Sequence, residues 1–140
     1  MSQFVLDEQL DHDTVLAPLQ NWVSAERLTA LRPGEHILDD RVPALLRALR
    51  RPTFLSIDSY FWRAAQCDPR YCILYFALRR DQQPLLPGLL RALLLLPVFR
   101  TRAARMGKVA RISTRTIEYR SFRAQGVQRL TWSGPRRSKR

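Results

Sequence analysis

Glycine, cysteine and histidine are scarce in this sequence, and their scarcity excludes several kinds of site. The five glycines include no GxGxxG or GxxxxGK pattern, so a glycine-rich phosphate loop is excluded. Cys67 and Cys72 do not form a CxxC pair, and the only histidines, His12 and His36, have no ligand-like spacing to them. A four-ligand zinc site is therefore excluded, and we expect reduced thiols, as in a cytoplasmic protein.

Long apolar runs are also lacking. The most apolar stretch, residues 85–99, is too short to span a bilayer and contains Arg91, Pro87 and Pro97. It predicts a buried amphipathic helix instead. The N-terminal residues run into four acids without a cationic region, so we expect no signal peptide, no membrane partner and a cytoplasmic location.

Acidic residues are rare in the second half of the chain. Ten of the twelve acids precede Pro69, whereas 17 of the 24 basic residues follow it, within a formal charge of +12. This asymmetry favours a phosphate-rich partner such as RNA, with a solvated basic face as the alternative. We expect a continuous basic surface that binds RNA phosphates, with one acid, Glu118, inside it, formed by Arg100, Arg102, Arg105, Lys108, Arg111, Arg115, Arg120, Arg123 and Arg129.

The length of 140 residues and the hydrophobic content of 46% predict one domain with a sizeable core. We place this domain at residues 1–132, with a core over 3–99 and a basic, β-rich segment over 100–132. Residues 133–140 are polar and basic, and we expect them to be a disordered tail.

Two apolar runs that each end on an acid organise the chain. Residues 3–6 read as a buried strand followed by Asp7, and residues 53–57 read as a second strand followed by Asp58. The carboxyl ends of parallel strands share one edge of a sheet, which is where open α/β sheets place their sites. We therefore expect Asp7 and Asp58 to lie close together, joined by the start of a helix at Asp39 or Asp40.

The remaining elements alternate between helix and strand. We predict helices near residues 13–23, kinked or short at Pro18, and near 40–49, 59–66 and 85–99. Strands are predicted near 26–31, 71–78, 109–112, 116–122 and 127–132, with a turn at residues 32–34 and another at Gly126. This order predicts an α/β three-layer sandwich with a mainly parallel central sheet, extended by a small β-rich segment.

Three segments resemble one family in their order and spacing. Residues 4–10, FVLDEQL, are similar to the "LLDEN" opening of PIN-like domains, especially the small stand-alone bacterial PIN-like proteins. Residues 39–42, DDRV, resemble the family's "D-x-x-I" helix start, and residues 56–61, SIDSYF, resemble its "T-x-D-x-D-F" segment. The apolar run at 71–78 takes the place of the following strand, so the resemblance covers about two thirds of the chain.

The resemblance implies a metal-dependent ribonuclease, and it extends to the VapC-type toxin class, whose members an antitoxin protein restrains. It implies Mg²⁺ or Mn²⁺ as cofactor, RNA as substrate, and an antitoxin or a second copy of the chain as candidate partners. Acid-bound Mg²⁺ or Mn²⁺ would support phosphodiester hydrolysis. The implied catalytic acids are Asp7, Asp39 and Asp58; the implied metal-binding set adds Glu8 and Asp40, and Ser56 takes the place of the family's Thr.

Tyr60 departs from the family pattern, which has a second Asp at this place. This departure supports an alternative, a non-catalytic nucleic-acid-binding or protein-interaction module with a degenerate PIN-like site. The individual residues also have structural interpretations. Asp39 or Asp40 is expected to cap a helix, and Asp58 is as good a cap as a ligand. The aromatic residues Tyr119, Phe122 and Trp132 could stack on bases or pack in a sheet.

Overall fold

The computed structural model describes residues 3–35, 37–63 and 66–132. The predicted tail at 133–140 lies outside the described residues, as do two positions of the helix predicted at 59–66. Within the described ranges no helix combines the length and the apolar character needed to cross a membrane.

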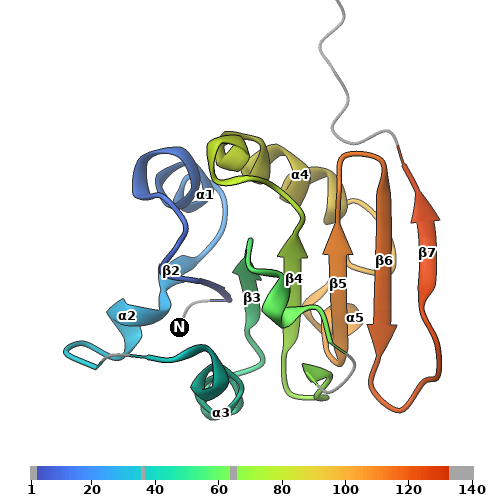
Figure 1. The fold of residues 1–140 in the computed structure, drawn as a ribbon, viewed down its shortest axis with the longest axis horizontal. Helices are drawn as coiled ribbons and strands as arrows, with labels where there is room; N and C mark the ends of the chain where they lie inside the picture. The colour runs from blue at the N-terminus through green and yellow to red at the C-terminus, as the bar shows by residue number, and fades with distance from the viewer. Residues whose placement is uncertain (1–2, 36, 64–65, 133–140) are drawn as a thin grey trace, which may run out of the picture.

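Seven strands form one mixed sheet in the order β2-β1-β3-β4-β5-β6-β7 (Figure 1). The first five strands are parallel, and β6 and β7 continue the sheet as an antiparallel meander. The α/β class and the mainly parallel sheet are thus confirmed. The strands are β1 (Phe4–Leu6), β2 (Ala25–Arg27), β3 (Thr53–Ser56), β4 (Cys72–Phe76), β5 (Lys108–Ile112), β6 (Thr116–Ser121) and β7 (Gln128–Thr131).

The helices are short and lie mostly in the connections between parallel strands. Several begin with a tighter or wider turn. Pro18 lies in the first turn of α1, and the segment just before α1 is a π-helix, so the chain forms no single long α-helix here. The α-helices are α1 (Ala17–Gln20), α2 (Leu28–Leu31), α3 (Val42–Ala48), α4 (Leu86–Leu93) and α5 (Arg102–Arg105); the π-helix is η1 (His12–Leu16), and the 3₁₀ helices are η2 (Asp39–Arg41), η3 (Ser59–Phe61) and η5 (Arg80–Leu85).

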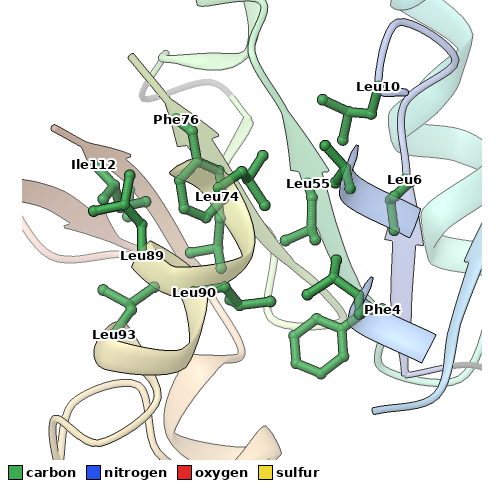
Figure 2. Packing of buried hydrophobic residues seen from close by; sticks show 14 of the residues in the cluster. Phe4, Leu6, Leu10, Leu55, Leu74, Phe76, Leu89, Leu90, Leu93 and Ile112 are labelled. Carbon is green, nitrogen blue, oxygen red and sulfur yellow. The ribbon is translucent and has the colours of Figure 1, made fainter. Parts of the chain in front are cut away.

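Alternating side chains of the central strands form two hydrophobic clusters on opposite faces of the sheet. Phe4 and Leu6 belong to one cluster, and Val5 between them belongs to the other. The first cluster packs against α1 and α4, as Figure 2 shows for Leu89, Leu90 and Leu93 of α4 above the strands. The second cluster contains buried side chains of α3, α2 and η3. Burial of both faces explains why β1, β3 and β4 are almost continuously apolar.

Several predicted elements differ from the structure in extent. The strand predicted at 26–31 covers only Ala25–Arg27, and the chain then turns into α2. The helix predicted at 85–99 begins as η5 and reaches only Leu93 as α4. Its buried residues, Leu86, Leu89, Leu90 and Leu93, lie on one face of α4, and Gly88 and Arg91 are exposed, as expected of an amphipathic helix. The three short C-terminal strands were predicted within one or two residues at each end.

Candidate functional site: carboxylates at the switch point of the sheet

The candidate site lies where the direction of strand addition reverses. From β1 the chain crosses to β2 on one side, and from β2 it crosses back to β3 on the other side of β1. The loops after β1 and β3 therefore diverge from neighbouring strands at the same edge. Asp7 follows β1 directly, and Asp58 lies two residues after β3. The predicted placement of these two acids on one edge agrees with this topology.

Asp7 is held rigidly although its side chain is charged at neutral pH in water. Its backbone N–H donates to the carbonyl of Leu55 at 3.0 Å, which extends the pairing of β1 with β3 by one residue. Only 7% of the residue is exposed. Burial raises the pKa of the Asp7 carboxyl, the hydrogen bond from Ser56 lowers it, and the charges of Asp58 and Glu8 raise it. The net shift is upward, so ionised Asp7 is held in an unfavourable environment.

Ser56 connects the two acidic segments. Its hydroxyl donates to Oδ2 of Asp7 at 2.7 Å and accepts from the backbone N–H of Asp58 at 3.0 Å. Ser56 is completely buried, so its hydroxyl makes these two hydrogen bonds in place of hydrogen bonds to water. The hydroxyl fixes the distance between the loop after β1 and the loop after β3.

Asp58 begins η3 and is its N-cap. Oδ1 of Asp58 accepts from the backbone N–H of Tyr60 at 2.9 Å, so the interpretation of Asp58 as a cap is confirmed. The side chain of Tyr60 makes packing contacts instead. Its ring packs edge-on against Phe61 with centroids 5.1 Å apart, and the guanidinium of Arg63 lies 4.5 Å from its centroid. Tyr60 thus supports the position of η3 by packing.

Asp39 joins the two acids from the connection between β2 and β3. Burial raises the pKa of the Asp39 carboxyl, and the charges of Asp58 and then Asp7 raise it further. The three carboxylates are thus close enough to repel one another. The expected capping role of Asp39 and Asp40 is wrong, because Leu38 caps η2, Arg41 caps α3, and neither cap has a side-chain hydrogen bond. Asp39 lies inside the first turn, so its carboxylate is not used as a cap.

Glu8 and Asp40, the two additional metal-ligand candidates, are exposed. The charge of Glu8 acts to raise the pKa of Asp7, and the charge of Asp40 acts to raise the pKa of Asp39. The backbone carbonyl of Glu8 accepts a hydrogen bond from Arg27 at 3.2 Å. Both residues add negative charge at the edge, and the central acids are Asp7, Asp39 and Asp58.

The chemistry of this donor set fits a hard divalent cation. Clustered carboxylates with raised pKa values are stabilised by a cation, and Mg²⁺ and Mn²⁺ prefer oxygen ligands. Across the described ranges, however, no group of three or more His, Cys, Asp or Glu side chains is arranged to hold a metal ion. Oδ2 of Asp7 accepts from Ser56, and Oδ1 of Asp58 accepts from the backbone N–H of Tyr60.

Arg105 does not lie on the expected basic surface. It is 1% exposed, and its guanidinium donates to Oγ1 of Thr53 at 3.0 Å, to the carbonyl of Phe99 at 2.9 Å and to Oε1 of Gln3. The guanidinium lies 5.0 Å from the ring centroid of Phe4. Arg105 therefore closes the amino-terminal end of the core, and the prediction that it contacts RNA phosphates is wrong.

Several of the other predicted phosphate contacts lie on β5, on β6 and in the turns beside β6. Arg111 lies in β5, Arg120 lies in β6, and Arg115 and Arg123 lie in the turns at opposite ends of β6. Arg120 stacks 5.1 Å from the centroid of Trp62, and Arg123 stacks 5.1 Å from that of Phe122.

The remaining predicted contacts lie near α5. Arg100 is exposed and donates to the carbonyl of Leu95 at 2.9 Å. Arg102 and Lys108 are half-buried, and Lys108 donates to the carbonyl of Ala104. We therefore restrict the predicted basic surface to residues that the strand register places side by side, as described below.

Sequence reasoning missed two residues that shape the site. Gln83 of η5 is fully buried, accepts from the backbone N–H of Asp11 at 2.7 Å and donates to the carbonyl of Gln9 at 3.2 Å, so it fixes the loop after Asp7. Tyr75 lies beside Ser56 in the register of β3 and β4, and it is only half-buried. Tyr75 carries one of the two hydroxyls in the apolar run at 71–78, and the other belongs to the buried Tyr71, so the sequence alone does not distinguish the two.

Comparisons of the chain with protein-family models, with curated proteins and with solved structures found no match.

Proposed function

We propose that this chain is a metal-dependent ribonuclease of the PIN-like type. The observation that carries the proposal is the mutual repulsion of Asp7, Asp39 and Asp58 at the switch point of the sheet. Repulsion among acids lowers the stability of the fold unless a cation relieves it, so its persistence is typical of a functional site. The three-layer PIN-like arrangement, with helices on both faces of the sheet, belongs to this proposal.

In the proposed site, Asp7, Asp39 and Asp58 would hold Mg²⁺ or Mn²⁺. The bound metal would supply an activated water for attack on phosphorus and would stabilise negative charge on the phosphate oxygens. Ser56 keeps Asp7 oriented through its 2.7 Å hydrogen bond, and Asp58 is oriented by the backbone N–H of Tyr60. Burial of Asp7 strengthens its interaction with a cation, because few water molecules compete for its oxygens. The chain would act on cytoplasmic RNA and be restrained by an antitoxin protein.

A second candidate is a non-catalytic nucleic-acid-binding or protein-interaction module. Tyr60 favours it, because the ring occupies the place of the family's acid and packs against Phe61 and Arg63. The arrangement of the described acids, which gathers no three around one point, also favours it.

A cleavage assay decides between the two candidates. We expect the full chain to cleave end-labelled RNA in Mg²⁺ or Mn²⁺, and we expect EDTA to abolish cleavage. Asp7→Asn and Asp58→Asn should each lower the rate by more than about 100-fold, because even outer-shell partners of a metal contribute 10 to 100-fold. Asp68→Asn is the matched control. Asp68 is at the opposite edge of the sheet, before β4, where it pairs with Arg70 and Arg47.

Two outcomes would contradict the ribonuclease proposal. Cleavage that persists in EDTA would not belong to the acidic site. A folded chain that binds RNA without cutting it in either metal would establish the non-catalytic module.

A further inference from the structure

One register row crosses the sheet from the acidic site to the last strand. Ser56 is paired with Tyr75, Tyr75 with Arg111, Arg111 with Glu118, and Glu118 with Arg129. Asp7 adjoins the row, because Leu6 pairs with Leu55 and the next residues share the 2.7 Å hydrogen bond. Directly paired residues have side chains on the same face of a sheet. We call Ser56, Tyr75, Arg111, Glu118 and Arg129 the polar row.

The outer part of the polar row, on β5, β6 and β7, lies on the open part of one face, whereas Ser56 is buried and Tyr75 is half-buried. Two residues before it on their strands, Phe54, Ile73 and Val109 belong to the cluster that packs against α3 and η3. The buried residues of that cluster on the sheet end at Val109 of β5. In Figure 1 no helix lies in front of β6 or β7. The side chains of Arg111 and Arg129 are accordingly 36% and 66% exposed.

Glu118 organises the basic end of the row. Its carboxylate accepts from Arg111 at 3.3 Å and from Arg129 at 2.6 Å, and its side chain is 18% exposed. One acid thus holds two guanidiniums in fixed positions, and the trio retains one net positive charge. Each guanidinium has five N–H donors, so both keep donors that can reach a phosphate.

The dimensions of the row suit a short single strand. Neighbouring strands are about 4.8 Å apart, so Arg111 lies about 14 Å from Asp7, and Arg129 lies about 24 Å from it. Single-strand sites of OB folds take from about 4 nucleotides upwards, so the row is long enough for a short single strand. Tyr75 stands between the acids and the guanidiniums and is half-buried. An aromatic ring can stack on a base only where that base is unpaired.

We propose that the polar row binds single-stranded RNA, with phosphates on Arg111 and Arg129 and a base against Tyr75. The strand would cross β7, β6, β5 and β4 towards the carboxylates of Asp7 and Asp58. That the strand is cut there rests on the proposed function, whereas binding along the row does not. An acidic protein segment would use the two guanidiniums but would not need the ring of Tyr75.

The test is fluorescence anisotropy of a labelled 12-nucleotide RNA with the full chain in EDTA, so that binding is measured without cleavage. We expect Arg129→Gln to weaken binding about 5-fold or more, and Tyr75→Leu to weaken it by about 5 to 100-fold through lost stacking. Tyr75→Phe keeps the ring and should bind like the wild type. Glu118→Gln should bind about 3-fold or more tightly, because one negative charge leaves the row.

Arg91→Gln is the matched charge control. Arg91 is exposed on α4, which packs on the opposite face, and its guanidinium lies 4.5 Å from the ring centroid of Trp22. It should change the affinity less than 2-fold at moderate salt, where distant charges are screened. Thermal unfolding of each variant establishes that it is folded before binding is compared. If Glu118→Gln fails to fold, Arg111→Gln replaces it, and weaker binding is then expected.

Three outcomes would overturn the inference: equal losses for Arg129→Gln and Arg91→Gln, no loss for Tyr75→Leu, or an RNA duplex that binds as tightly as the single strand. Binding lost only in Arg129→Gln, with Tyr75→Leu unaffected, would show that the row holds phosphates without stacking a base on Tyr75, which refutes that part of the inference. Because all binding is measured in EDTA, a chain that binds along the row but never cleaves would refute only the proposed function. A chain that cleaves with unchanged KM in the row variants would refute only this inference.

Discussion

Asp7 is buried and Asp68 is partly buried, and their environments shift the pKa of the carboxyl group in opposite directions. Burial raises the pKa of Asp7, and the hydrogen bonds from the Ser56 hydroxyl and the backbone of Glu8 do not compensate for it. Burial also acts to raise the pKa of Asp68, but hydrogen bonds from Arg70 and the charges of Arg70 and Arg47 outweigh it and lower the pKa. One acid therefore destabilises the folded chain when ionised, and the other stabilises it.

We expect Asp7→Asn to raise the Tm at pH 7. Below the ordinary aspartate pKa of 3.8, the carboxyl is protonated in the folded and unfolded states alike, so wild type and variant should differ little. As the pH rises past that value, the unfolded state ionises first and the wild type loses stability relative to the variant. Thermal unfolding at several pH values between 4 and 8 measures this. A lower Tm for Asp7→Asn at pH 7 would contradict the expectation.

Asp68→Asn provides the control of opposite sign. Its lowered pKa contributes stability that is present above 3.8 and lost as the pH falls through the folded-state pKa. This variant should therefore have a lower Tm than the wild type at pH 7, with a difference that shrinks in acid. Gain of stability together with loss of cleavage at Asp7 would mark that residue as functional, because functional sites commonly reduce stability.

The positions of the acids at the ends of β1 and β3 were easier to predict from the sequence than the positions of the basic residues. Asp7 and Asp58 could be found because an apolar run that stops on an acid also shows where the strand ends. Arg105 could not, because nothing in its local sequence distinguishes a core guanidinium from a surface one. Its partners Gln3, Thr53 and Phe99 are contributed by distant segments. Asp39 was assigned as a cap for a similar reason, since capping depends on backbone angles that the sequence does not state.

At the scale of elements, the strand ends were predictable where apolar residues give way abruptly to polar ones. They were less predictable where one element follows another without a connecting residue. β1, β3 and β4 are apolar runs between polar residues, and they were found within one or two positions. α2 follows β2 without a connecting residue, so the sequence pattern read as one strand. The row that joins Tyr75 to Arg129 was beyond prediction, because strand register across β4 to β7 depends on tertiary pairing.

Gly107 connects α5 to β5 and has a backbone φ of +86°. Its N–H donates to the carbonyl of Tyr71 at 2.9 Å, and its carbonyl accepts from the N–H of Phe122 at 2.7 Å. These two bonds hold the start of β5 between β4 and β6. An L-residue here must either keep a left-handed conformation or break the bonds.

We expect Gly107→Ala to destabilise the chain by about 1 to 2 kcal/mol, the usual cost of the left-handed region for an L-residue. Gly34→Ala is the comparison, since Gly34 also has a positive φ of +80° but lies in an open turn with nothing near its added Cβ. That turn can relax, so its cost should stay below about 1 kcal/mol. Urea denaturation of the three proteins provides the free energies of unfolding. Equal losses at both glycines would show that the bonds around Gly107 do not fix its conformation.

At the scale of the whole molecule, the basic segment is part of the sheet rather than an appendage. β5 pairs with β4, and β6 and β7 extend the same sheet. Ala110, Ile112 and Ile117 belong to the hydrophobic cluster that also contains Phe4 and Leu6. The strands that form the polar row thus also complete the core beneath it. The division into a core at 3–99 and a basic segment at 100–132 is therefore a division of charge and not of packing.

We expect a fragment that ends at residue 99 to be unfolded. Without β5, the buried strand β4 becomes an open edge, and Arg105 no longer bonds to Thr53 and Gln3 at the amino-terminal end of the core. Unsatisfied backbone groups and exposed apolar side chains then oppose folding. Circular dichroism with thermal unfolding tests this, and a chain that ends at Trp132, which retains every described strand, is the control. A cooperative transition in the shorter fragment would show that residues 3–99 fold by themselves, and the basic strands would then have to be regarded as an addition to a complete domain.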